Sequence, residues 1–212
     1  MNNTLRFLTR ICELGAFGVD YQESAKKLKS VYLISDDDLS KYLALMTNRD
    51  FLSLKTLSQV QIHKNFINAY AVDVFGAFDK EEQLLLNAKH EALKKINAVC
   101  EKEQVGIEDF GKYATNAYVK SIIGFGCVFG FFDVGDYGYG IELIDCAARD
   151  GDVDAKLYLL TVKPESAKEI LTDIANTSEY LYKFSHLRAW LEHYNVKDVK
   201  IKHLTGKVGF GL

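Results

Sequence analysis

The chain has 212 residues, of which 48% are hydrophobic, and its mean hydropathy is −0.07. These values are typical of a globular protein with enough apolar material for a core, and they exclude an intrinsically disordered chain. The formal net charge of −3 is too small to indicate a polyanionic partner by itself. Pro164 is the only proline, and this scarcity favours an all-α fold because helix interiors tolerate proline least.

The cysteines and the apolar runs bear on the cellular compartment. Cys12, Cys100, Cys127 and Cys146 are widely spaced and form no CxxC pair, which is typical of buried, reduced thiols. The longest apolar run, 121–132, is well short of the ~20 residues that a membrane-spanning helix needs. No signal peptide is recognisable at the N-terminus. We therefore expect a cytoplasmic protein with no membrane partner.

Apolar residues at steps of three and four predict several helices in the first third of the chain. The predicted ranges are 4–17, 21–33 and 39–47, followed by a longer apolar helix over 57–78. Ser35 and the three aspartates after it precede the third helix, where they would supply an N-cap and negative charge for its first turn. A capped helix start accounts for all of these residues, so it is preferred to a metal site.

A charged helix is predicted from residue 80 to about residue 104, with Asp79 as its N-cap and Gly106 beyond its end. Its apolar side chains are expected to face the core: Leu84, Leu85, Ala88, Ala92, Ile96 and Val99. Its charged side chains are expected to face solvent: Glu81, Glu82, Lys89, Glu91, Lys94 and Lys95. Two further helices are predicted after Pro164, over 165–175 and 178–194.

The end of the chain differs in charge from the rest. Residues 183–212 contain six Lys or Arg against Glu192 and Asp198, which gives this segment a net charge of +4. We interpret the basic, glycine-containing segment 196–212 as a short strand or a docked tail. No linker-like composition divides residues 1–195, so one helical domain is predicted there. Residues 1–50 form either part of that domain or a separate small helical cap.

Small residues recur between residues 119 and 155 at positions where two helices would cross. Gly124 would let a second helix approach the first, Gly130 would permit the turn between them, and Asp136 would cap the second helix. The pattern continues at Ala147, Ala148, Gly151 and Ala155. Such spacing predicts a pair of helices joined by a short turn, with Gly151 supplying a positive φ after the second one.

This pattern resembles the Sel-one-like repeat, a relative of the tetratricopeptide repeat that is built from helix pairs of about 36 residues. The chain departs from the family pattern where Gly140 replaces an alanine, Cys127 an aromatic residue and Leu160 a glycine. One clear unit is recognisable, and a second one begins at Leu159. The resemblance implies a helical-repeat array, an α-α superhelix, that binds another protein on the concave surface lined by the first helix of each unit.

The resemblance also points to the side chains that would contact a partner protein. They are Tyr118, Lys120, Phe125, Phe129 and Tyr137. Each aromatic side chain has an alternative explanation, which is burial against the neighbouring pair of helices. If they are exposed, these aromatic side chains could anchor a partner.

No motif for catalysis, a cofactor or a metal ion is recognisable in the sequence. The glycines from Gly124 to Gly130 miss the spacing of a dinucleotide-binding loop. The alternating aspartates of 150–154 imitate the start of a calcium loop, but the loop's required Gly and Glu are missing and the turn of the repeat accounts for the same residues. The five histidines lack metal-ligand spacing.

We therefore expect a non-enzymatic protein–protein interaction module without a cofactor. It would act as an adaptor, or as a stoichiometric inhibitor of the immunity-protein type, and its oligomeric state stays open. One alternative is a helical protein that binds DNA or RNA through the basic C-terminal segment. Nucleic acid is a less favoured partner than another protein. The other alternative is an enzyme with an unrecognised site, formed by Asp133, Asp136, Glu142 and Asp145.

Overall fold

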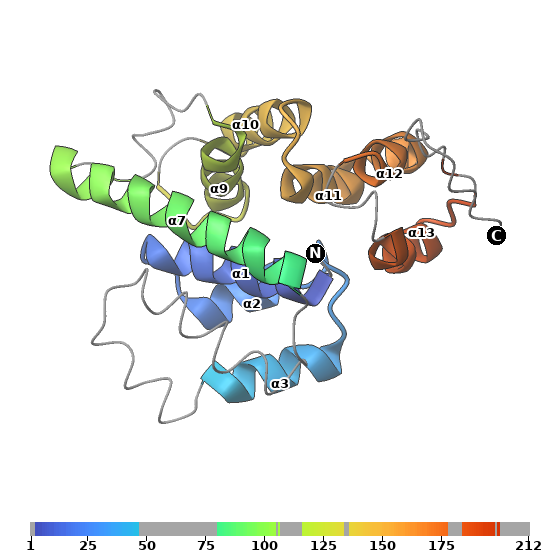
Figure 1. Cartoon of the computed structure of the whole chain (residues 1–212), viewed down its shortest axis with the longest axis horizontal. Helices are drawn as coiled ribbons and strands as arrows, with labels where there is room; N and C mark the ends of the chain where they lie inside the picture. Colours follow the sequence, from blue (N-terminus) through green and yellow to red (C-terminus); the bar gives the residue numbers. More distant parts are fainter. Residues whose placement is uncertain are drawn as a thin grey trace.

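The computed structural model describes residues 3–46, 80–104, 106, 116–133, 136–177, 184–197 and 199. Within these ranges all regular secondary structure is helical (Figure 1), which confirms the predicted all-α fold. None of the described helices is long and apolar enough to span a membrane. The helix predicted over 57–78 and the strand or tail predicted for 196–212 fall outside the described residues, apart from residues 196, 197 and 199.

Three helices make up the N-terminal part of the fold: α1 (Asn3–Ala16), α2 (Tyr21–Leu28) and α3 (Asp36–Met46). The ring of Phe7 on α1 packs edge-on against Tyr32 and Tyr42, with ring centroids 6.1 and 5.5 Å away. All three rings are fully or almost fully buried. These contacts tie α1 to α3 and to the turn that follows α2, so we call residues 3–46 the N-terminal unit.

The polar residues at the starts of these helices act as caps. Ser35 caps α3 as predicted, since its Oγ accepts a hydrogen bond from the Asp38 amide at 3.1 Å. Asp20 caps α2 in the same way, through the Glu23 amide at 2.9 Å. α2 ends at Leu28 instead of residue 33, and the chain then turns through Leu33, whose φ is +51°.

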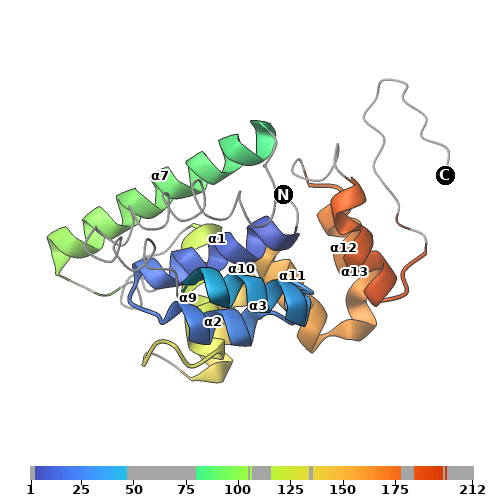
Figure 2. The ribbon, with the colours of Figure 1, turned by 90° about the horizontal axis from the view of Figure 1, so that it is seen from below.

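The long helix α7 (Lys80–Glu103) crosses over α1, as Figures 1 and 2 show. The face that it turns inward is only partly the predicted one. Ile96 packs against the core, and Glu91, Lys94 and Lys95 are exposed, as predicted. Leu84 is 60% exposed and Val99 is 38% exposed, whereas Glu82 is only 4% exposed. Lys89 is also turned inward, with a 14% exposed side chain. The reason is tertiary, because α7 lies opposite buried carboxylates of other helices, which a lysine can pair with and a leucine cannot.

The predicted pair of helices is present in the structure, as α9 (Ala117–Val128) packed against α10 (Tyr137–Arg149). Asp136 caps α10 by accepting a hydrogen bond from the Tyr139 amide at 2.9 Å. Gly130 and Gly151 have φ angles of +65° and +100°, which only glycine adopts without strain, and each ends a helix. The turn chemistry of this segment was therefore predicted correctly.

The two helices approach closely at Gly124. A Cβ atom at this position would lie 2.7 Å from Cγ1 of Ile144 and 3.1 Å from the carbonyl oxygen of Gly140. Gly140 gives α10 the same property, since a Cβ there would lie 2.9 Å from that of Cys127. The predicted small residues behind this crossing are buried: Ala147, Ala148 and Ala155. The helix crossing thus needs two glycines facing each other.

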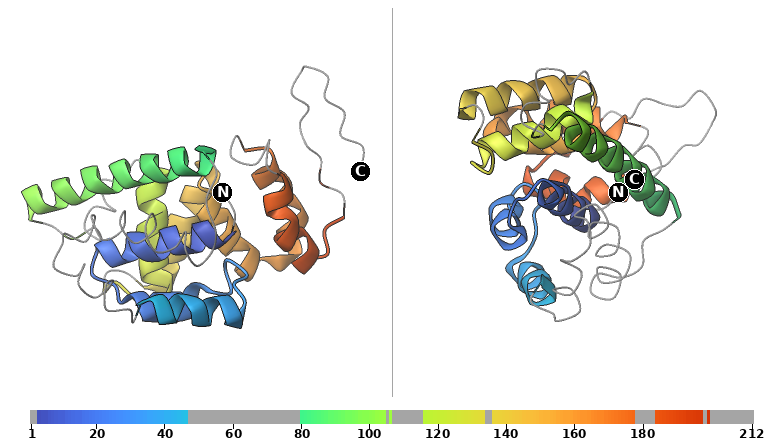
Figure 3. Two further views of the ribbon diagram at one scale, coloured as in Figure 1. Left: turned by 60° about the horizontal axis from the view of Figure 1, so that its bottom comes forward. Right: turned by 90° about the vertical axis from the view of Figure 1, so that its left-hand side faces the viewer.

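The remaining described helices continue from the pair and return to the N-terminal unit (Figure 3): α11 (Val153–Val162), α12 (Ala167–Ala175), α13 (Arg188–His193) and two 3-10 turns, η3 (Pro164–Ser166) and η4 (Phe184–Leu187). The indole of Trp190 on α13 is fully buried and donates a hydrogen bond to the Val31 carbonyl at 3.4 Å. α13, near the end of the described residues, therefore contacts the N-terminal unit.

We predict that Gly124→Leu destabilises the protein by about 1–3 kcal/mol through overpacking at the α9–α10 crossing. The gain in helix propensity from replacing glycine is at most about 1 kcal/mol, so it does not offset the clash. Urea unfolding followed by circular dichroism measures the change.

Glu142→Leu is the matched control, because it introduces the same side chain at a position of α10 that is exposed. Its free energy of unfolding should stay within about 0.5 kcal/mol of the wild-type value. Equal stabilities of the two variants would show that Gly124 does not lie at a tight crossing.

Candidate functional site

A stripe of charged residues runs along α1 and is buried. Arg6, Arg10 and Glu13 are spaced four and three residues apart, which places them on one face of the helix. Their side chains are at most 1% exposed. Since a buried charge without a partner is very unfavourable, this face requires compensating groups from other helices.

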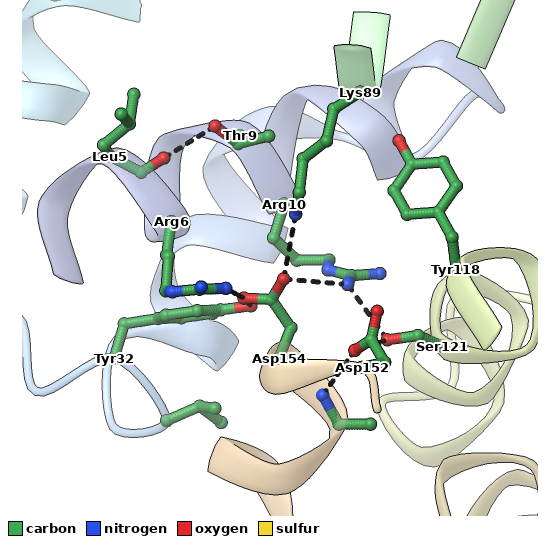
Figure 4. Close-up of polar contacts among 12 residues, drawn as sticks. Leu5, Arg6, Thr9, Arg10, Tyr32, Lys89, Tyr118, Ser121, Asp152 and Asp154 are labelled. Carbon is green, nitrogen blue, oxygen red and sulfur yellow. Dashed lines mark hydrogen bonds and ion pairs between the residues drawn. The ribbon is translucent and has the colours of Figure 1, made fainter. Parts of the chain in front are cut away.

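The principal compensating group is Asp154, in the first turn of α11 (Figure 4). Its Oδ1 atom lies 3.2 Å from Nη1 of Arg6 and accepts a hydrogen bond from the Tyr32 hydroxyl at 3.1 Å. Its Oδ2 atom lies 3.0 Å from Nζ of Lys89 and 3.4 Å from Nη2 of Arg10. Burial alone would raise the pKa of Asp154, but Lys89, Arg6 and Arg10 hold it well below the ordinary carboxyl value.

Glu13 is the second buried carboxylate. It accepts a hydrogen bond from the Tyr118 hydroxyl at 2.9 Å, and it lies 3.2 Å from Nε of Arg10 and 3.8 Å from Nζ of Lys89. Burial and the neighbouring Glu13 carboxylate raise the pKa of Tyr118, so its hydroxyl keeps its proton and acts as a donor.

Asp152 is the third carboxylate, and it connects α11 to α9. Its Oδ1 atom caps α11 through the Ala155 amide at 2.7 Å and also accepts from the Ser121 hydroxyl at 2.8 Å. Ser121 in turn accepts from Nη2 of Arg10 at 3.0 Å. Burial and the nearby Asp154 raise the pKa of Asp152, in opposition to the two neighbouring cations Arg10 and Lys89.

These groups form one charge-balanced assembly, which we call the ionic cluster: Arg6, Arg10, Lys89, Glu13, Asp152 and Asp154. It contains three cations and three carboxylates contributed by α1, by α7 and by the start of α11. Burial lowers the pKa of Lys89, but Asp154 and Glu13 raise it by more, so the amine stays protonated and is no nucleophile. The arrangement is suited to holding helices together. A small hollow of about 370 Å³, with Lys89, Tyr118 and Asp152 among its lining residues, lies beside the ionic cluster.

The predicted partner-contacting residues fall into two groups. Phe125 is fully buried and is not available to a partner, so the alternative of burial against neighbouring helices holds for it. Its ring packs against Tyr158 at 5.5 Å and lies 4.6 Å from the Arg10 guanidinium carbon. Tyr118 is directed toward Glu13. The physical reason is that α1 covers the face of α9 on which a partner was expected.

The other three candidates lie nearer the surface. Lys120 pairs with Asp150 at 2.8 Å, and Phe129 is partly buried beside Phe125, at a centroid distance of 5.9 Å. Tyr137 is 56% exposed, with its hydroxyl 3.4 Å from that of Tyr158. The structure therefore does not gather the five predicted residues on one open surface.

The carboxylates considered for an enzyme site are not brought together as a buried site. Asp133, Asp136 and Glu142 are exposed, and Asp145 pairs with Lys163 at 3.0 Å. Of the aspartates of 150–154, Asp150 pairs with Lys120, Asp152 caps α11 and belongs to the ionic cluster, and Asp154 is the centre of that cluster, a role that the predicted repeat turn did not include.

An open groove of about 1070 Å³ lies between α10, α11 and α12. Its lining includes the buried apolar side chains of Ala148 and Leu159 and charged side chains of both signs. The charged residues that line it are Asp145, Arg149, Lys156, Glu165, Lys168, Glu169 and Asp173. Lys156 is held by Asp173 at 2.6 Å, whereas Lys168 and Glu169 are exposed on α12.

Sequence reasoning missed both the ionic cluster and the groove. The signal for the cluster was the spacing of Arg6, Arg10 and Glu13 on a helix otherwise rich in apolar residues. A charged stripe of this kind is usually solvated, and nothing local distinguishes a buried one. The partners Lys89 and Asp154 follow 76 or more residues after Glu13 (89 − 13 = 76), so no sequence spacing connects them.

No family model matches this chain, and no curated protein or solved structure is significantly similar to it. The resemblance of residues 119–155 to the Sel-one-like repeat therefore stays a prediction made from those residues.

We predict that Asp154→Asn destabilises the protein by about 3–5 kcal/mol, because it leaves three buried cations with too little negative charge. The free energy of unfolding in urea measures this effect. Asp150→Asn is the matched control. Asp150 lies outside the ionic cluster, is about half exposed and pairs with Lys120. Its loss should change stability by no more than about 1 kcal/mol, and similar effects of both substitutions would contradict a buried role for Asp154.

The pH dependence of stability gives a further prediction. Since the pKa of Asp154 is depressed in the folded state, its contribution is complete above the unfolded-state pKa and is lost as the pH falls below about 4. The stability difference between wild type and Asp154→Asn should therefore shrink by up to about 1.4 kcal/mol per pH unit between about pH 4 and pH 3. The charge of Asp154 contributes to the raised pKa of Asp152, so the substitution also changes the titration of Asp152, and the stability difference reports on the coupled pair. A constant difference over this range would contradict the depressed pKa of Asp154.

Proposed function

We propose that this protein is a non-enzymatic interaction module that binds another protein through the groove between α10, α11 and α12. The observation that carries the proposal is the groove itself, an open depression of about 1070 Å³ whose lining combines apolar side chains with charged side chains of both signs. A surface with a buried apolar centre and a polar rim is the usual anatomy of a protein–protein interface.

The chemistry of the lining favours binding over catalysis. Neither histidine nor cysteine is among the lining residues. The hydroxyl of Thr172 donates within its own helix, to the Lys168 carbonyl at 2.6 Å, and the Lys156 amine is held by Asp173. The groove thus offers charges for recognition, without a nucleophile placed beside a base.

The groove also suits a protein partner better than a small ligand. Small-molecule pockets enclose most of their ligand and are mainly apolar, whereas here exposed acidic and basic side chains line the groove. Mixed charges of this kind select a partner by electrostatic complementarity. The helix pairs α9–α10 and α11–α12 would form the repeat units of a Sel-one-like array, with the groove formed where α10 of the first pair meets both helices of the second.

We predict that exchanging the charges of two neighbouring groove residues, in the double variant Lys168→Glu/Glu169→Lys, weakens partner binding at least about tenfold, equivalent to about 1.4 kcal/mol. The exchange keeps the net charge constant, so a general electrostatic effect is excluded. The measurement is affinity capture of the stoichiometric partner by the tagged chain, followed by titration with the purified partner.

The double variant Glu91→Lys/Lys94→Glu on α7 is the control, because both residues are exposed and lie outside the groove. It should bind the partner as the wild type does. Recovery of no stoichiometric protein, or equal binding by both double variants, would refute the groove as the binding surface.

A further inference from the structure

The face of α9 and α11 that would line the concave side of a repeat array is covered in this protein by its own first helix. We define the receptor face as Ser121 and Phe125 on α9 with Asp152 and Asp154 at the start of α11. Arg10 contacts three of these residues: it donates to Ser121 at 3.0 Å, lies 3.4 Å from Asp154, and places its guanidinium carbon 4.6 Å from the centre of the Phe125 ring. Figure 4 shows Arg6 and Arg10 converging on Asp154.

α1 makes two chemically different sets of contacts. Phe7 packs against the rings of Tyr32 and Tyr42, which belong to the N-terminal unit. The charged stripe, in contrast, is directed at the receptor face, as is the Tyr32 hydroxyl, which donates to Asp154. Aromatic packing therefore holds the N-terminal unit together. On the receptor face, charges and hydrogen bonds of α1 add to the apolar contacts of one shared core.

A charged interface separates more easily than an apolar one of the same area. When oppositely charged side chains separate, each regains its hydration, and this offsets most of the attraction that is lost. Apolar surfaces gain no such compensation when they become exposed to water. Nη1 of Arg10 has no hydrogen-bond partner among the described residues. A buried guanidinium nitrogen without a partner is unfavourable, so it offsets part of the stability that the ion pairs provide.

From this geometry we infer that the receptor face is a binding site for an α-helix with two arginines one turn apart, and that α1 is its resident occupant. A partner protein presenting such a helix would replace α1 when the N-terminal unit moves away. The helical spacing matters because Arg6 and Arg10 reach the two oxygens of one carboxylate, Asp154, only when they are four residues apart. Arginine is required because its planar guanidinium group can form an ion pair, donate a hydrogen bond and stack on an aromatic ring at the same time, as that of Arg10 does. The ammonium group of lysine cannot do all three.

A peptide of residues 3–16, fluorescently labelled and with Cys12→Ser to prevent oxidation, tests this inference. The full chain carrying Arg10→Ala keeps an intact receptor face but has a weakened resident helix. It should bind the peptide at least about tenfold more tightly than the wild-type chain does. A peptide with both Arg6→Ala and Arg10→Ala is the matched control and should bind neither chain.

A receptor variant completes the experiment. The chain carrying Arg10→Ala together with Phe125→Leu should lose peptide affinity, because the ring beneath the arginine is gone. Absence of peptide binding to a folded Arg10→Ala chain, or equal binding of the control peptide, would overturn the inference and show that α1 is a fixed part of the core.

If Arg10→Ala fails to fold, the wild-type chain still decides the matter. Titration with the peptide, followed by NMR, should shift resonances of Ser121, Phe125 and Asp154, while shifts elsewhere or none at millimolar peptide would refute the proposal. The inference does not rest on the groove, since the chain with Lys168→Glu/Glu169→Lys should bind the peptide unchanged. Failure of either proposal can therefore be recognised separately.

Discussion

A single buried carboxylate, Asp154, connects the three parts of the described fold. Its two oxygens receive Arg6, Arg10 and the Tyr32 hydroxyl from the N-terminal unit and Lys89 from α7, while its own backbone starts α11. An unpaired charge at this depth would be strongly unfavourable, so the helices that carry the cations must take up positions around it. The placement of α1 and α7 over the helix pairs follows from this requirement as much as from apolar burial.

The same requirement explains which surfaces are closed and which stay open. α1 brings its charged stripe to the receptor face, and in doing so it buries Phe125 and turns Tyr118 inward. The opposite side of α11 is free of α1, and there α10, α11 and α12 leave a groove whose charges pair only in part. Docking by charge on one side and an open groove on the other give the protein two faces of different chemistry.

Local features of the fold could be read from the residues. The helices over 3–16, 36–46 and 167–175, the caps at Ser35 and Asp136, and the glycine turns at 130 and 151 all follow from preferences that act within a few residues. The close approach of α9 and α10 at Gly124 also belongs to this group, because small residues at crossing positions are a local pattern. Periodicity was enough to predict the all-α class.

The facing of α7 and the contents of the site could not be read in this way. Leu84 is exposed and Lys89 is directed inward because the groups opposite α7 are Glu13 and Asp154, which come from distant parts of the chain. Whether a charged stripe on a helix is solvated or buried depends on the charge of the surface that it meets, and that surface exists only after folding. Helix positions and turns were thus determined by the sequence alone, since they arise from short-range sterics and hydrogen bonding. The ionic cluster and the groove were decided by tertiary packing, since electrostatic compensation acts between residues that only the fold brings together.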